Sequence, residues 1–181
     1  MNASQTMAGR QFIAGRRVAS GEATLLSLRA VDGEATGHRF YPASREEAAQ
    51  AAEAAQQAFA VYSQTTPQQR ARFLCAIADE LDALGEAFFA LAEQETALPL
   101  ARLQGERART SGQLRMFAGV IQRGDTFAAR IDTALADRQP LPRPDLRQYQ
   151  QALGPVAVFG ASNFPLAFST AGGDTASALA A

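Results

Sequence analysis

A short apolar run, Val156-Ala157-Val158-Phe159, constrains the fold of this chain more than any other feature of its sequence. The run contains no polar residue, is rich in β-branched and aromatic side chains, and has glycines close to it on both sides. These properties are typical of a strand that is buried on both faces of a parallel sheet. The sequence therefore predicts a strand at residues 156–159.

A turn and a helix are expected directly after this strand. Residues 161–164 would form the turn, and Pro165 could begin a helix that runs through Leu179. A parallel strand needs neighbouring strands to pair its backbone donors and acceptors, and no second buried strand follows the helix. We therefore expect a sequence that is cut rather than finished.

The first part of the chain predicts short strands and then helices. Apolar pairs broken by glycines favour short strands joined by turns over residues 11–40. Two pairs of residues three apart, Ser44 with Glu47 and Thr66 with Gln69, have the capping-box pattern of helix starts. Apolar residues at helical spacing extend these two helices to about Tyr62 and Leu84.

Two more helices and a polar connector are expected next. One helix resumes around Phe88 and is interrupted at Leu98-Pro99, and another covers about residues 101–122 and stops at Gly124. Four successive helices could suggest a bundle, but the buried strand that follows does not fit one. Polar, proline-containing residues 124–144 predict a connector into a candidate exposed strand at residues 146–151.

Charge and composition argue against several classes of function. The 17 basic and 18 acidic residues give a net charge of -1, so we expect neither a nucleic acid nor a membrane surface as a partner. All basic residues are arginine, which removes lysine Schiff-base chemistry. One cysteine and one histidine provide no metal-ligand spacing, so no metal is expected. Residues 1–17 lack the apolar run of a signal peptide, and no stretch approaches the ~20 apolar residues of a membrane span, so we expect a cytoplasmic protein.

The region between Gly154 and Pro165 does not match either of two common catalytic motifs. A phosphate-binding P-loop requires a lysine, and the chain has none. A hydrolase nucleophile elbow requires Gly-x-Ser-x-Gly, but the sequence after Gly160 and Ser162 has Phe164 in place of the last glycine. The histidine of that fold also follows its serine, whereas His38 lies far before it.

The same region resembles another family. Residues 153–160, Leu-Gly-Pro-Val-Ala-Val-Phe-Gly, and then Ser162-Asn163-Phe164-Pro165-Leu166 resemble the stretch of aldehyde dehydrogenases that leads into their Asn-Phe-Pro turn. The preceding helices are also similar to the family in order and spacing, at Arg70-Ala71-Arg72-Phe73-Leu74, at Glu93-x-Glu95-Thr96-x-Leu98-Pro99, and from Arg102-Leu103-x-Gly105-Glu106 through Gln113-Leu114. The resemblance covers nearly the whole chain.

This resemblance implies an α/β fold that forms the N-terminal part of the aldehyde dehydrogenase fold. Residues 1–124 would hold N-terminal strands and helices of the cofactor-binding domain, and residues 125–151 an oligomerisation arm. Residues 152–181 would start the Rossmann-like parallel sheet, truncated after its first strand and the helix that follows. The intact protein is therefore expected to be a homo-oligomer.

The C-terminal residues narrow the resemblance to one branch of the family. Ala171-Gly172-Gly173-Asp174-Thr175-Ala176-Ser177-Ala178-Leu179 resembles α-ketoglutaric semialdehyde (2,5-dioxovalerate) dehydrogenases and an NADP-preferring bacterial aldehyde dehydrogenase. Most of the family has tryptophan before the turn asparagine, and Ser162 at this position supports the branch. The expected substrate is therefore a small-molecule aldehyde, with a keto-acid semialdehyde as a candidate, and the expected cofactor is NADP or NAD.

Asn163 is the candidate catalytic residue that the resemblance implies. In the family, a thiolate attacks the aldehyde, the resulting thiohemiacetal gives up hydride to nicotinamide, and water releases the acid. The asparagine that matches Asn163 donates its amide to the oxyanion, and loss of one such donor typically costs ~10²–10³ in rate. From pattern alone, an asparagine in a turn more often bonds its own backbone, so that alternative stays open.

The cofactor groove would be lined by the positions that surround this asparagine. They are Gly160, Ala161, Ser162, Phe164 and Pro165, at the carboxyl edge of the expected sheet. The family lacks the common Gly-x-Gly-x-x-Gly fingerprint, so its absence here is not evidence against a dinucleotide. The lysine that contacts the ribose in the family would lie beyond Ala181.

Four other residues attract attention but are expected to be structural or solvated. Cys75 lies in an apolar helical segment and does not match the family's nucleophile, which lies downstream with the general-base glutamate, so we expect a core residue. His38 is expected to be a solvated surface residue. Gln113 and Arg115 could face substrate in this branch, but a solvated helix face is the favoured interpretation.

Two functions remain as hypotheses. In the first, the parent protein is an NAD(P)-dependent aldehyde dehydrogenase, and this chain, which lacks the nucleophile and the base, is inactive alone. In the second, the chain is a truncated or degenerate relative that binds partners without catalysis. The reading frame after Ala181 distinguishes the two.

Overall fold

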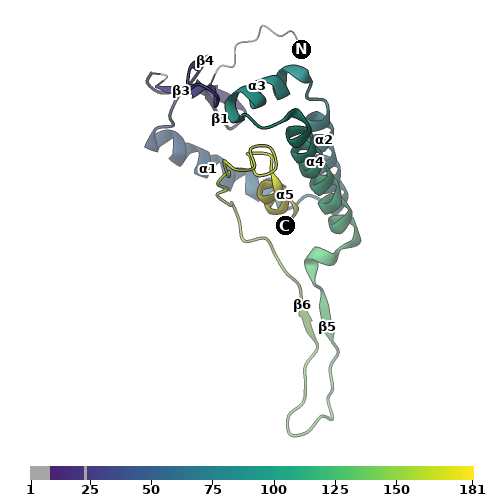
Figure 1. Ribbon diagram of the computed structural model, residues 1–181. Coiled ribbons are helices and arrows are strands. Elements are labelled where there is room, and N and C mark those ends of the chain that lie inside the picture. The colour runs from purple at the N-terminus through teal and green to yellow at the C-terminus, as the bar shows by residue number, and fades with distance from the viewer. Residues whose placement is uncertain (1–8, 23) are drawn as a thin grey trace.

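A computed structural model describes residues 9–22 and 24–181, so the expectation about residues 1–17 lies partly outside the described residues. The chain begins with two antiparallel hairpins, as predicted for residues 11–40. The first pairs β1 (Gln11–Ile13) with β2 (Arg16–Val18), and the second pairs β3 (Leu25–Leu28) with β4 (Ala35–Phe40). Both hairpins lie at the end of the molecule above helix α1 (Figure 1).

The first two helices begin at the predicted capping boxes. Helix α1 (Arg45–Tyr62) has Ser44 as its N-cap, and helix α2 (Pro67–Asp82) has Thr66. In both cases the side chain of the third helical residue, Glu47 or Gln69, accepts a hydrogen bond from the N-cap backbone. Unpaired N–H groups at the helix start are thereby satisfied by local side chains, which is why sequence alone located these boundaries.

Helices α3 (Glu86–Thr96) and α4 (Leu100–Arg123) follow close to their predicted positions. Helix α4 ends at Gly124, which adopts a left-handed backbone conformation with φ 79°. Glycine reaches this conformation without steric cost, so it stops the helix where the sequence indicated.

The core lies between helices α2, α4 and the C-terminal helix α5 (Gly173–Ala180). The fully buried side chains include Leu74 of α2 and Ile121 of α4, with Ala176 of α5 packed against them. A second cluster joins Phe89 of α3 to Leu103 of α4 and includes Leu166 from the loop before α5. Helix α4 therefore contributes to both clusters and connects them.

A long hairpin projects away from the helices (Figure 1). After a short 3-10 turn (Asp125–Phe127), strand β5 (Arg130–Asp132) pairs antiparallel with β6 (Leu146–Gln148). The exposed strand predicted at residues 146–151 is therefore present but shorter. Strand β5 was not predicted, because the sequence of the connector has no apolar alternation.

The strand predicted at residues 156–159 is not formed, and this prediction was wrong. The segment has no regular secondary structure and pairs with no strand among the described residues, and Val156 and Phe159 are 60% and 86% exposed. All three sheets of the described chain are two-stranded hairpins formed by other residues. Without an adjacent strand, an apolar segment has nothing to pair its backbone.

The helix predicted from Pro165 to Leu179 begins later than expected, at Gly173. Residues 162–171 form successive turns instead. The amides of Leu166 and Ala167 donate to the Glu106 carboxylate of α4. The Phe168 carbonyl accepts from the Ala161 amide and the Leu166 carbonyl from the Thr110 hydroxyl, in place of i to i+4 helical bonds. The loop ends at Gly172, where the backbone packs closely against residue 167. A side chain does not fit at this position, because a Cβ there would lie 2.6 Å from the Ala167 carbonyl oxygen.

Ion pairs on the surface join α2 to α4. The Arg115 guanidinium contacts Asp79 at 2.6 Å and Asp82 at 2.7 Å. Arg115, followed by the Ser111 hydroxyl, holds the pKa of Asp82 below its ordinary value of 3.8. A carboxyl whose pKa is lowered by folding stabilises the fold above its unfolded pKa and loses that contribution as the pH falls through its folded pKa.

We predict that Asp82→Asn lowers the free energy of unfolding at neutral pH by less than about 1 kcal/mol, because the pair is exposed. The difference from the unmodified protein should shrink as the pH falls below 3.8, the ordinary value of the unfolded carboxyl, and through the lower pKa of folded Asp82. Urea unfolding between about pH 3 and pH 7 measures this dependence. Glu80→Gln, an exposed change on the same helix, is the control. A difference that stays constant over this pH range would contradict the assignment.

Candidate functional site

The candidate site is the turn of residues 161–164, which lies between the exposed segment 156–159 and helix α5. The Phe164 amide donates to the Ala161 carbonyl at 3.4 Å and closes the turn. The Ala161 amide donates to the Phe168 carbonyl at 2.9 Å, so the loop folds back on itself. In Figure 1 this loop lies beside α5, near the middle of the molecule.

Asn163 lies at the exposed side of this turn. Its side-chain amide forms no hydrogen bond with any residue that the structure describes, in contrast to the usual behaviour of turn asparagines. The backbone of the turn is held by other groups, so the amide is not needed for the turn to form. It is available to donate to a bound molecule.

The predicted cofactor-binding residues surround Asn163 and are accessible. Gly160, Ala161 and Ser162 are exposed, Phe164 is 39% exposed, and Pro165 is half-buried. Gly160 lies against the loop, because a Cβ there would be 3.2 Å from the Phe168 carbonyl oxygen. Small residues on this edge leave the backbone open to close approach by a ligand.

A groove lies beside α5, next to the segment that precedes the turn. Its walls are residues 156–159 on one side and Asp174, Ser177 and Ala178 of α5 on the other. The apolar wall suits planar rings, and the exposed Ser162 hydroxyl suits a ribose hydroxyl group. The Ser177 hydroxyl donates to the Asp174 carbonyl and can still accept from a ribose hydroxyl group. This set of residues fits one edge of a nicotinamide dinucleotide.

Helix α4 holds the loop that carries the turn. Glu106, which is only 5% exposed, accepts hydrogen bonds from the Leu166 and Ala167 amides at 3.0 and 3.2 Å. One helical turn further on, the Thr110 hydroxyl donates to the Leu166 carbonyl at 2.9 Å. Sequence reasoning assigned no role to Glu106. The available signal was a carboxylate on the apolar face of α4, between Leu103 and Leu114.

Two arginines of α4 cover aromatic rings of the same loop. The Arg102 guanidinium lies 4.9 Å from the centre of the Phe164 ring, and that of Arg109 lies 5.0 Å from Phe168. The two rings meet edge to face at 5.8 Å. Cation–π contacts of this kind stabilise exposed sites by about 0.5–1 kcal/mol each, so they add modestly to the anchoring.

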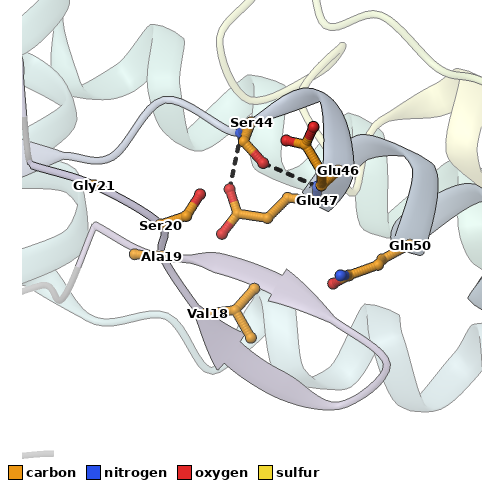
Figure 2. Close-up of a pocket in the computed structure, with 8 residues that line it drawn as sticks. All are labelled: Val18, Ala19, Ser20, Gly21, Ser44, Glu46, Glu47 and Gln50. Carbon is orange, nitrogen blue, oxygen red and sulfur yellow. Dashed lines mark hydrogen bonds between the residues drawn. The ribbon is translucent and has the colours of Figure 1, made fainter.

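A second hollow lies far along the sequence from these residues, where the end of β2 faces the start of α1. It is lined by Val18, Ala19, Ser20, Gly21, Ser44, Glu46, Glu47 and Gln50 (Figure 2). Two of the donors at the helix start are already used, since Glu47 accepts from the Ser44 backbone and the Ser44 hydroxyl accepts from the Glu47 backbone. The hollow contains none of the candidate residues, and we assign it no function.

Cys75 and His38 lie apart from the turn. Cys75 is half-buried on α2 and packs against the main core, in agreement with the structural role expected for it. His38, on β4, is half-buried rather than solvated, and its Nδ1 is buried without a hydrogen-bond partner among the described residues. The expectation of a solvated histidine was therefore wrong, because the side chain faces inward from the hairpin.

Gln113 and Arg115 differ from each other in their surroundings. Gln113 is half-buried and faces α5, since a Cβ on Gly173 would lie 2.7 Å from its Oε1. The solvated position expected for it was wrong. Arg115 is exposed, as expected, and is held by the carboxylates of α2. Neither lies on the turn that carries Asn163.

The described residues offer neither a membrane-spanning helix nor a metal site. No helix there is long and apolar enough to cross a membrane. Within the same residues, no three histidine, cysteine, aspartate or glutamate side chains gather where they could hold a metal ion.

Comparison with known proteins identifies the family. Residues 19–181 match the aldehyde dehydrogenase family. The chain belongs to the aldehyde dehydrogenase family. It is 60% identical over 173 residues to an α-ketoglutaric semialdehyde dehydrogenase of Acinetobacter baylyi, a match that covers 96% of this chain and 33% of that protein. It is 52% identical over 176 residues to α-ketoglutaric semialdehyde dehydrogenase 2 of Azospirillum brasilense, covering 97% and 34%. The chain thus spans about a third of the length of these curated relatives.

Solved structures confirm the fold class. A betaine aldehyde dehydrogenase from Staphylococcus aureus, in complex with NAD+, superposes with a TM-score of 0.81 at 24% identity, over 98% of this chain and 34% of that one. Another structure of a betaine aldehyde dehydrogenase from S. aureus in complex with NAD+ gives 0.80 at 25% identity, over 96% and 33%. The chain is therefore an α/β part of the aldehyde dehydrogenase fold, as the resemblance implied.

We predict that Cys75→Ser in the intact aldehyde dehydrogenase leaves turnover intact. The variant should lose about 1 kcal/mol of stability, because a hydroxyl replaces the thiol against an apolar core. Thermal unfolding and aldehyde oxidation, measured together, check both statements. Cys75→Ala, which removes the thiol without adding a hydroxyl, is the matched control. Complete loss of activity in a folded Cys75→Ser protein would show that Cys75 is the nucleophile.

Proposed function

We propose that this chain is the N-terminal part of an NAD(P)-dependent aldehyde dehydrogenase that oxidises an aldehyde to the carboxylic acid. The observation that carries this proposal is the exposed Asn163 amide, on a turn that other groups hold in place, in a chain of this family. The names of the two curated relatives favour α-ketoglutaric semialdehyde as the substrate. The thiolate nucleophile and the general base would come from residues outside 1–181, as the family resemblance implies.

Asn163 would supply the positive end of an amide dipole to the substrate oxygen. When a nucleophile adds to an aldehyde, the carbonyl oxygen gains negative charge, and a fixed uncharged donor stabilises that charge without being neutralised by it. Because the Asn163 amide bonds to no described residue, it need not break an internal hydrogen bond to do so. The donor is therefore free before the charge develops.

NADP or NAD would bind against Gly160, Ala161, Ser162, Phe164 and Pro165, and along the groove beside α5. The solved relative with NAD+ supports a nicotinamide cofactor. When bound, the cofactor accepts the hydride that leaves the substrate carbon. The residues of this chain would orient it: Gly160 and Ala161 allow close backbone approach, and the Ser162 hydroxyl can hydrogen bond.

The hairpin of β5 and β6 would serve as an oligomerisation arm between residues 125 and 151. It projects from the helices, and its apolar side chains Ile131, Leu141 and Leu146 are at least half exposed. An exposed strand edge with apolar side chains is a surface for pairing with a second copy. The division into residues 1–124, 125–151 and 152–181 is part of this proposal, and the cytoplasmic location stays a prediction.

Asn163→Ala in the intact protein should lower kcat by about 10²–10³, because the donor acts on charge that is absent from the free aldehyde. The KM for the cofactor and the unfolding temperature should change little, since the amide is exposed and makes no internal hydrogen bond. Steady-state NAD(P)H formation with α-ketoglutaric semialdehyde measures both constants. Thr170→Ala, an exposed change in the same loop but outside the proposed cofactor groove, is the control and should keep most of the turnover. Unchanged turnover in Asn163→Ala would remove Asn163 from the mechanism.

Residues 1–181 expressed alone should show no aldehyde-dependent NAD(P)H formation, because an oxyanion donor cannot replace a thiolate and a base. They should also self-associate through the exposed apolar segment around Val156 and Phe159. Activity assays with NAD and NADP and size-exclusion chromatography test the two parts. Aldehyde-dependent turnover by residues 1–181 would contradict the expected inactivity, and a monodisperse monomer would contradict the expected self-association.

A further inference from the structure

A buried carboxylate on α4 has the position and the partners to control the Asn163 turn. Glu106 lies on the same face of the helix as Leu103 and Thr110, and only 5% of it is exposed. A carboxylate removed from water is costly unless it is paired and fully hydrogen bonded. Its partners therefore show what the residue does.

Both oxygens of Glu106 are occupied. Oε2 accepts the Leu166 and Ala167 amides at 3.0 and 3.2 Å, and Oε1 accepts the Arg102 guanidinium at 2.7 Å. Hydrogen bonds to an ionised group are about twice as strong as those between neutral groups. Two consecutive backbone amides on one oxygen fix the direction of the chain at residues 166–167.

Arg102 extends this contact to the turn itself. While it pairs with Glu106, its guanidinium lies 4.9 Å from the ring centre of Phe164, the residue that follows Asn163. The Thr110 hydroxyl holds the Leu166 carbonyl from the same helix. Helix α4 thus holds the loop just after Asn163 at two backbone amides, at the Leu166 carbonyl and at the Phe164 ring.

We propose that Glu106 is a positioning residue that sets the orientation of the Asn163 amide toward the substrate oxygen. Glu106 touches no reacting atom, and its effect passes through Leu166, Ala167 and the Arg102–Phe164 contact. The inference rests on the proposed function, because it assigns Glu106 a part in the reaction that Asn163 would serve. Displacement of a catalytic donor by about 1 Å can cost up to ~10² in rate, so a shift of the turn would be measurable.

The test is a double-mutant cycle between Glu106→Gln and Asn163→Ala in the intact enzyme. Glutamine keeps the size of the side chain but has a single acceptor oxygen, so it cannot accept from the two backbone amides and from Arg102 at the same time, and its NH2 group faces a donor at one of these positions. In the native background, Glu106→Gln should lower kcat by about 10-fold to 100-fold, with the KM for the cofactor little changed. In the Asn163→Ala background it should lower kcat no further, because no amide remains to be positioned.

Stability separates positioning from a general structural role. The loss of unfolding temperature caused by Glu106→Gln should be the same in both backgrounds, whereas its effect on kcat disappears in one. Arg115→Gln is the matched control, because Arg115 lies on α4 like Glu106. The change breaks its ion pairs to Asp79 and Asp82 of α2 without touching the loop. It should lower stability and leave kcat within about twofold.

Two outcomes would overturn the inference. An equal fold-loss of kcat from Glu106→Gln in both backgrounds would show that it does not act through Asn163. An unchanged kcat in Asn163→Ala alone would remove the proposed oxyanion donor, and with it the role of Glu106. If Glu106→Gln does not fold, Thr110→Val removes the contact to the Leu166 carbonyl and should show the same dependence on Asn163, which an equal loss in both backgrounds would contradict.

Discussion

The arrangement of the candidate site depends on one buried interaction, the Glu106 carboxylate of α4 with the amides of Leu166 and Ala167. These donors lie in a loop, where neither a helix nor a sheet provides acceptors for them, and the carboxylate is buried away from the water that would otherwise hydrogen bond to it. Each group makes the burial of the other possible. Because α4 also joins both hydrophobic clusters, the turn after residue 160 is tied to the helix that connects the two cores of the described chain.

The helices could be predicted because their boundaries are fixed by neighbouring residues. Ser44 with Glu47 and Thr66 with Gln69 form the capping boxes that the sequence indicated, and Gly124 ends α4 in the left-handed conformation. The fold class and the position of the Asn-Phe-Pro turn were predicted from the family resemblance, because local signals of this kind could not indicate them. It also explains why only part of a sheet was expected from the chain.

The errors share a physical cause: the outcome depended on groups distant in sequence. The strand expected at 156–159 requires neighbouring strands, which the described chain does not supply, so its side chains lie exposed. The helix expected from Pro165 is replaced by turns whose carbonyls are bound by other groups: the Leu166 carbonyl accepts from the Thr110 hydroxyl of α4, and the Phe168 carbonyl accepts from the Ala161 amide. His38 was judged by its polar neighbours in sequence, although the hairpin turns it inward. Glu106 interrupts an apolar helix face. This pattern indicates that its carboxylate has a buried partner, but it does not indicate which residues that partner includes.

The most direct measurement is backbone amide exchange at Leu166 and Ala167 in the intact protein, compared with Glu106→Gln. If the carboxylate holds the loop, both amides exchange slowly in the native protein and faster in the variant, while the Leu74 amide in the α2 core is unchanged. This readout does not depend on the substrate or on the cofactor. Equal exchange at Leu166 and Ala167 in the two proteins would contradict the claim that Glu106 fixes the turn that carries Asn163.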